Sequence, residues 1–219
     1  MPKKALKHVP LFSDLTEREL ELLVASGSRR KFPPKNIIFQ EGEPGDFLLV
    51  ILSGKVKVII SGKDGEEFIL TLLGPGSFFG EMALLEGGYR SATVMTVEPS
   101  VFLQIEKKDF SELLKRQPRI ALKILNSLSQ RLRKATEQIR SLVMFNIDGR
   151  VSRCLLNLAE AQGERVNEQL VIVNRPSFKD LAQMVGCSRE TLSRTMKTLR
   201  NNGCLTITRN TIYINKVWE

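Results

Sequence analysis

The chain has 219 residues, 42% of them hydrophobic, and a formal net charge of +9 at pH 7, which suits a soluble globular protein of one or two domains. No apolar run approaches the roughly 20 residues that span a bilayer, and the basic start lacks the apolar core of a signal peptide, so we expect a cytoplasmic protein without membrane contact. The single histidine, His8, and the three scattered cysteines, Cys154, Cys187 and Cys204, do not suit a metal or haem site, and we expect free, buried thiols.

The first half of the chain predicts a short helix followed by a small β domain. Residues 13–26 form an amphipathic pattern in which Thr16 and Glu19 have the spacing of a capping box. From residue 28 to 106, short runs of Val, Ile, Phe and Leu alternate with glycine turns, a pattern typical of an antiparallel barrel or jelly roll. The Asp64–Gly65 pair is the strongest hairpin signal.

Within this β region the stretch FGEMALLEGGYRSATV, residues 79–94, contains two charges in a small, apolar context. Glu81 and Arg90 lie nine residues apart. Burying an unpaired carboxylate or guanidinium costs several kcal/mol or more, so a partner is required. The two groups therefore either pair with each other or bind a third group.

Pro118 begins a predicted long helix that has no further proline and no glycine before Gly149. Apolar residues recur in it at alternating spacings of four and three, the a/d pattern of a two-stranded coiled coil. We predict that this seam joins two copies of the chain, because so long a 3.5-residue repeat is narrower than a globular face needs; the alternative is a core-facing helix of a monomer. The seam residues are Ala121, Leu125, Leu128, Leu132, Ala135, Ile139 and Leu142.

The last third predicts three helices and a hairpin. Asp148 is expected to cap the first helix. The predicted helices cover 150–161, 177–185 and 188–201, and two β-branched runs, 205–208 and 211–215, form a hairpin or wing.

The basic excess lies entirely in the second half of the chain. Residues 1–111 contain 14 Lys and Arg against 15 Asp and Glu, whereas residues 112–219 contain 19 against 9. Positive charge confined to one part of a chain indicates a polyanionic partner, with nucleic acid the first candidate and an acidic membrane surface the second.

The second and third of these helices have the pattern of a helix-turn-helix. Gly186 permits a tight turn and Ser188 can cap the following helix. Arginine suits the two acceptors of guanine, glutamate suits the amino group of cytosine, and Ser188 or Thr191 suits a phosphate. The alternative is a solvated helix face with a Glu190–Arg194 ion pair, but the turn, the wing and the charge favour DNA. The outward-facing set is Arg189, Glu190, Ser193, Arg194, Lys197 and Arg200.

From RLRKATEQIRSL through DGRVSRCLLNLA to GCSRETLSRTMKTL, the chain resembles the CRP/FNR transcription regulators over nearly its whole length. The resemblance implies an α+β protein with three parts. These are an N-terminal cyclic-nucleotide-binding β-roll (jelly roll) over 1–117, a long coiled-coil dimerisation helix and hinge over 118–146, and a C-terminal winged helix-turn-helix over 147–219.

The same resemblance implies a DNA-reading set and its target. Arg189, Glu190 and Arg194 correspond to the family's base-reading residues, and the DNA-binding set is completed by Ser188, Thr191 and Lys197. A TGTGA-like half-site is implied, and dimer symmetry gives a palindrome of double-stranded DNA. The polar loop over 160–168 corresponds to a surface that contacts RNA polymerase.

The segments Gly80-Glu81-Met82-Ala83-Leu84 and Arg90-Ser91-Ala92 are similar to the phosphate-binding cassette of cyclic-nucleotide-binding domains. The resemblance implies that the third group is a cyclic nucleotide. Glu81 can accept from the ribose 2′-hydroxyl, while Arg90 and Ser91 can bind the phosphate together with backbone N–H groups that follow Gly80. The alternative is a Glu81–Arg90 ion pair in a β-roll kept for its architecture.

The residues that would bind the base match the family's pattern only in part. The family's two adjacent hydroxyl residues on the long helix match Ala135 and Thr136, so only Thr136 could reach the base across the dimer. Loss of the first hydroxyl removes a contact worth on the order of 1 kcal/mol, which leaves cAMP the expected ligand and cGMP open. Alternatively, Ala135 serves only to pack the seam.

We therefore expect a dimeric, cAMP-responsive, sequence-specific DNA-binding transcription regulator. One alternative is a DNA-binding regulator whose β-roll responds to another effector or to none, and another is a cyclic-nucleotide-binding subunit of an enzyme or channel. No catalytic residue, metal or cofactor is expected, because a single N-terminal histidine provides no Ser/His/Asp or Cys/His set.

Overall fold

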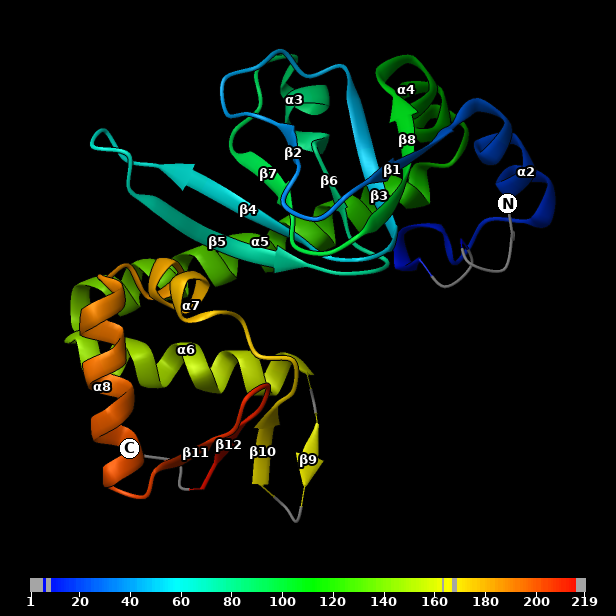
Figure 1. Cartoon of the computed structure of the whole chain (residues 1–219). Helices are drawn as coiled ribbons and strands as arrows, with labels where there is room; N and C mark the ends of the chain where they lie inside the picture. Colours follow the sequence, from blue (N-terminus) through cyan, green and yellow to red (C-terminus); the bar gives the residue numbers. More distant parts are fainter. Residues whose placement is uncertain (1–5, 7–8, 163, 167–168, 216–219) are drawn as a thin grey trace. The chain divides into compact units, whose positions relative to one another are not determined.

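The computed structural model describes residue 6 and residues 9–162, 164–166 and 169–215 (Figure 1). These form two compact units, 1–132 and 133–219, which are described separately. None of the helices in these ranges is sufficiently long and apolar to cross a membrane.

The first unit opens with a 3-10 turn, Pro10–Phe12, and helix α2, Glu17–Ser26. The predicted capping box is confirmed, since the Thr16 hydroxyl accepts from the Glu19 N–H and Glu19 accepts from the Thr16 N–H. Because Thr16 is the N-cap, the helix begins later than the predicted residue 13. Helix α2 packs its apolar face into a core shared with the β domain.

Eight strands and a short helix form the β-roll, which confirms the predicted antiparallel architecture (Figure 1). One sheet has the order β1-β8-β3-β6 and the other β2-β7-β4-β5. The predicted hairpin joins β4 to β5, with Gly65 at φ +82° in its turn. The strands are β1 Ser28–Phe32, β2 Ile37–Phe39, β3 Phe47–Ser53, β4 Val56–Ser61, β5 Glu67–Leu73, β6 Phe78–Phe79, β7 Thr93–Thr96 and β8 Ser100–Glu106, and helix α3 covers Glu81–Glu86.

Two helices follow the β-roll. Helix α4, Lys107–Arg116, was not predicted, whereas α5, Pro118–Met144, begins at the expected proline. Near its start α5 buries Ile120 and Ile124 in the core that contains α2.

The predicted seam of α5 remains largely exposed in the single chain. Leu125, Leu132, Ile139 and Leu142 are 58%, 69%, 63% and 44% exposed, but Leu128 is partly buried against its own chain's core. Solvent-exposed leucines in such a row suit an interface between copies. The seam itself stays a prediction.

The second unit, from residue 133 onward, combines three helices with a small antiparallel sheet of order β11-β12-β10-β9. The predicted helices and the wing, formed by β11 and β12, are confirmed. The elements are α6 Ile147–Gln162, β9 Arg165–Val166, β10 Gln169–Ile172, α7 Phe178–Val185, α8 Arg189–Asn201, β11 Leu205–Ile207 and β12 Ile212–Ile214.

Three local predictions in this unit need correction. Asp148 does not cap α6: the helix begins at Ile147, and Asn146 Oδ1 accepts from the Gly149 N–H at 3.0 Å. Residues 160–168 are not one polar loop, because α6 continues to Gln162 and Arg165–Val166 form a strand; residues 163, 167 and 168 lie outside the described residues. The cysteines are free, as predicted, but only half-buried as whole residues. Burial still raises the pKa of the Cys154 thiol to about 12.

Candidate ligand-binding and DNA-binding sites

Glu81 is a buried carboxylate at the start of α3. It follows Gly80, whose φ of +86° turns the chain from β6 into the helix, and the residue is 1% exposed. Its Oε1 accepts from Arg131 Nη1 at 2.8 Å, and Arg131 also donates to the Phe78 carbonyl. Glu81 therefore forms its ion pair with the long helix, and not with Arg90.

The second oxygen of Glu81 is open. Among the described residues Oε2 is buried and has no hydrogen-bond partner. Burial raises the pKa of Glu81 above its ordinary value of 4.5, while the charge of Arg131, a backbone hydrogen bond and the charge of Arg90 oppose that rise. A buried carboxylate with one bound and one free oxygen is suited to accept from a ligand hydroxyl.

Of the three guanidinium nitrogens of Arg90, only Nη1 has hydrogen-bond partners among the described residues. Its Nη1 donates to the carbonyls of Phe47 at 2.8 Å and Gly80 at 3.0 Å, and its guanidinium lies over the Phe39 and Phe47 rings at 4.2 and 4.5 Å. Burial lowers the pKa of Arg90, opposed by Asp46, Glu43 and Glu81. Nε and Nη2 are buried without a partner in the described part of the chain, so two donors remain for an anion.

The backbone comes very close to these groups. A Cβ on Gly45 would lie 2.4 Å from Ala83 Cβ and 3.0 Å from Arg90 Nε, so no side chain fits there without displacing one of them. The loop over 40–46 is tied to the cassette, because the Arg90 N–H donates to the Glu43 carbonyl at 2.8 Å. The absence of a side chain at Gly45 thus leaves room for the Arg90 guanidinium.

The structure brings together six of the seven predicted ligand-binding residues. Ser91 is exposed beside Met82, with Oγ 3.5 Å from its Sδ, and Ala83 is buried behind them. Thr136 lies on the exposed side of α5 in the other unit, and its contact with a base stays a prediction. The six are Gly80, Glu81, Met82, Ala83, Arg90 and Ser91.

Sequence reasoning missed Arg131. The signal was available: Ile120, Ile124 and Leu128 mark the core-facing side of α5, and Arg131 continues that side one turn later. A cation on an otherwise apolar helix face needs an acidic partner, which Glu81 provides.

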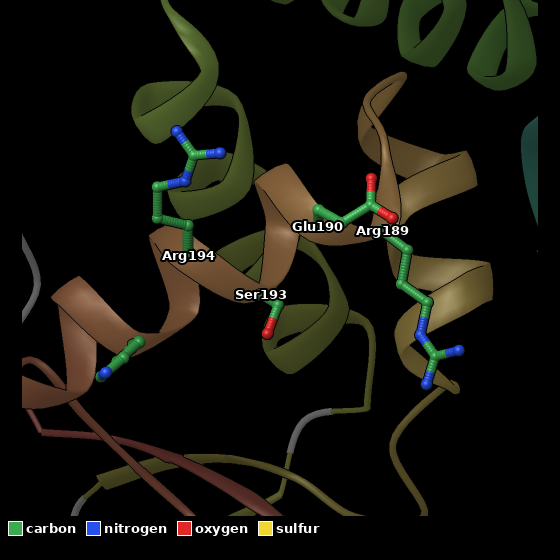
Figure 2. A pocket seen from close by; sticks show the side chains of 5 residues that line it. Arg189, Glu190, Ser193 and Arg194 are labelled. Carbon is green, nitrogen blue, oxygen red and sulfur yellow. The ribbon is translucent and has the colours of Figure 1, made fainter.

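The predicted DNA-reading residues lie on α8. Ser188 is its N-cap and accepts from the Thr191 N–H at 3.1 Å, while Gly186, at φ +72°, ends α7. Leu192, Thr195 and Met196 are buried. The opposite side bears an open pocket of about 470 Å³, whose lining side chains project from α8 (Figure 2). They are Arg189, Glu190, Ser193, Arg194 and Lys197.

This surface is not neutralised by its own carboxylate. Glu190 is four residues from Arg194, yet no ion pair joins them, and no hydrogen bond to either side chain is formed by any described residue. Three cationic side chains and one carboxylate therefore face outward together. Such a set can donate to phosphates and guanine edges and accept from cytosine.

Comparison with known proteins gives matches for both units. The family model of the cyclic nucleotide-binding domain matches residues 29–117, and that of the Crp-like helix-turn-helix domain matches residues 149–217. The cyclic AMP receptor protein of Thermus thermophilus is 33% identical over 96% of this chain and 94% of its own. A CRP-like cAMP-activated global transcriptional regulator of Mycobacterium tuberculosis is 30% identical over 84% of this chain and 82% of its own.

Comparison with solved structures gives matches to the same kind of protein. The c-di-GMP-responsive global regulator CLP of Xanthomonas campestris superimposes with a TM-score of 0.81 at 28% identity, covering 92% of this chain and all of that one. The Thermus thermophilus catabolite activator protein gives 0.56 at 34% identity, covering 95% and 94%. An effector-type β-roll joined to a winged helix-turn-helix defines a transcription regulator. The chain belongs to the CRP/FNR family, and this membership indicates DNA binding and dimers.

Proposed function

We propose that the chain is a dimeric, sequence-specific DNA-binding regulator that responds to a cyclic nucleotide, with cAMP as the effector. The observation that carries the proposal is the group of three buried, unpartnered polar atoms, Glu81 Oε2 and Arg90 Nε and Nη2, within the matched cyclic nucleotide-binding region. Unsatisfied buried polar groups are costly, so a ligand with both hydroxyl and anion complements them. A ribose cyclic phosphate has these two groups close together.

One other effector class is supported by specific observations. Ala135 provides no hydroxyl for a base, and the CLP regulator, which has the same fold, responds to c-di-GMP. The second candidate is therefore a DNA-binding regulator with a different effector. The cassette favours the cyclic mononucleotide, since Glu81, Arg90 and Ser91 are all present.

On the DNA side, we assign base reading to Arg189, Glu190 and Arg194, and phosphate contacts to Ser188, Thr191 and Lys197. Because the Ser188 Oγ already caps α8, it can contribute only its remaining capacity. We propose TGTGA-like half-sites in a palindrome, dimerisation through the α5 seam, and contact with RNA polymerase near residues 160–168. The functional parts are assigned to 1–117, 118–146 and 147–219.

Coupling follows from where the effector would lie. Arg131 joins Glu81 to α5, and Thr136 lies five residues further along that helix. An effector that binds one α5 arrangement more tightly shifts the population towards it, which changes how the DNA-binding domains are presented.

The decisive experiment is a calorimetric titration of the purified protein with cAMP, cGMP and c-di-GMP, each with and without a palindromic TGTGA-type duplex. We expect cAMP to bind and to strengthen duplex binding. Binding of c-di-GMP alone would establish the second candidate. If none of the three nucleotides alters duplex binding, the nucleotide response must be removed from the proposal.

Effector affinity is expected to depend on pH through Glu81. Its pKa is raised above 4.5 by burial, and the ionised form accepts the ligand hydroxyl best, so affinity falls as pH is lowered through that pKa. The loss begins at a higher pH than for an exposed glutamate and approaches tenfold per pH unit below it. Calorimetry from about pH 8 to about pH 5 measures this, with folding followed by circular dichroism. A Glu81→Gln variant should bind the effector weakly, and its affinity should change little with pH. An equal slope of affinity against pH in both proteins would contradict the assignment of this pH dependence to Glu81.

DNA affinity is expected to fall steeply with salt. Each phosphate neutralised adds about −0.9 to the slope of log affinity against log salt. Lys197→Ala should reduce that slope by about one and weaken all sequences alike, whereas Arg189→Ala should cost specificity for one base pair, about 1–3 kcal/mol. Fluorescence anisotropy at several salt concentrations measures both. A flat dependence would argue against DNA as the partner of this surface.

A further inference from the structure

The corner between α5 and α6 is closely packed. Asn146 Oδ1 accepts from the Gly149 N–H, and a Cβ on Gly149 would lie 3.1 Å from the Phe145 Cβ, so glycine lets Phe145 sit against the start of α6. The two helices are also joined across the corner by an ion pair between exposed side chains, Glu137 Oε2 to Arg153 Nη2 at 3.8 Å. The first turn of α6 therefore has a direction set by the end of α5.

One side chain of that first turn reaches α8, the helix that bears the proposed base-reading residues. Asp148 Oδ1 accepts from Thr195 Oγ1 at 2.8 Å. Thr195 is 6% exposed and belongs to the core-facing side of α8, beside Leu192 and Met196. A buried threonine hydroxyl commonly bonds to the carbonyl four residues earlier, but here it bonds to a carboxylate on another helix.

This bond differs in kind from the other contacts between the helices. On the same side of α8, Leu192, Met196 and Leu199 pack into the apolar core of this unit. Apolar packing is non-directional and tolerates small rotations, whereas a charge-assisted hydrogen bond requires a defined distance and angle. Thr195 directly follows Arg194, so a rotation of α8 that broke the bond would also turn the DNA-facing side chains.

We infer that Asp148 is a positioning residue for DNA reading: through Thr195 it fixes the rotation of α8 relative to the α5–α6 corner. The inference rests on the proposal that Arg189, Glu190 and Arg194 read bases. It gives Asp148 a positioning role in place of the capping role that its sequence position predicted, which Asn146 fills in the structure. It also places a specific contact between the corner and the recognition helix.

The test uses the full-length protein, a specific palindromic duplex and a scrambled duplex of equal length. Thr195→Val keeps the shape and removes the hydroxyl, and Asp148→Ala removes the acceptor; each should lower specific affinity about tenfold and leave scrambled-duplex affinity unchanged. Thr195→Ser and Asp148→Asn keep a donor and an acceptor and should restore specific binding. In the Asp148→Ala background, Thr195→Val should add little further loss, because both changes break one bond.

Each outcome decides a different point. Equal behaviour of the valine and serine variants, or additive losses in the double variant, would overturn the positioning role. A lower melting temperature with an unchanged ratio of specific to scrambled binding would show a purely structural bond, and would also overturn it. Arg194→Ala is measured alongside: if it leaves specificity intact, the base-reading proposal itself fails, which separates the two.

Discussion

Replacing Arg90 by leucine is expected to abolish the proposed effector response while the protein remains a folded dimer. The variant lacks both open donors, Nε and Nη2, and charge-assisted hydrogen bonds are each worth roughly 1.5–3 kcal/mol. We therefore expect effector affinity to fall on the order of 100-fold or more, and effector-dependent DNA binding to disappear. Calorimetry with cAMP and anisotropy with a palindromic duplex measure the two effects.

Two comparisons keep this result interpretable. Arg29→Leu removes an exposed arginine on β1 and should change neither measurement. Arg90→Lys keeps the charge but not the planar fork and should bind with intermediate affinity. Since Arg90 also donates to the Phe47 and Gly80 carbonyls, circular dichroism and sedimentation must show an intact dimer. A normal response in a folded Arg90→Leu dimer would exclude the cassette as the effector site.

The second large effect is expected from the seam of α5. The double variant Leu132→Glu/Ile139→Glu places two carboxylates in a row whose apolar side chains are 69% and 63% exposed in the single chain. Burying these charges against a second copy costs several kcal/mol per charge, so the dimer should dissociate. We expect sedimentation as a monomer and a loss of palindrome affinity of about 100-fold or more, because only one half-site can then be bound.

The matching variant is Arg133→Glu, which is also an exposed position on the same helix but lies outside the seam. It should sediment as a dimer. The effector contacts proposed for Glu81 and Arg90 do not involve the seam residues, so the monomer should retain part of any cAMP affinity. A double variant that still sediments as a dimer would place the interface elsewhere.

Local signals in the sequence predicted most of the fold because each depends on few residues. The capping box at Thr16 and Glu19, the proline at 118 and the glycine at 186 all mark helix ends directly. The β-roll was predicted as a class from its glycine turns. Helix α4 was missed, since ten residues between a strand and a proline carry too short a pattern.

Tertiary contacts were harder to predict. Nothing local shows that Asn146 and not Asp148 caps α6, because both residue types can cap. In the structure Asp148 instead accepts from Thr195, 47 residues later. The cassette residues stay a prediction, and the partner of Glu81 was left open between Arg90 and a ligand. The structure shows Arg131 in that role, a residue 50 positions away, and this distance along the chain explains the omission.

Gly45 matters for genetic studies of this regulator. It is not among the residues that we assign to effector binding, but any larger residue there collides with the methyl group of Ala83 or with the Arg90 guanidinium. A screen for unresponsive alleles should therefore recover changes at this loop position. A survey of cassette residues alone would miss such alleles.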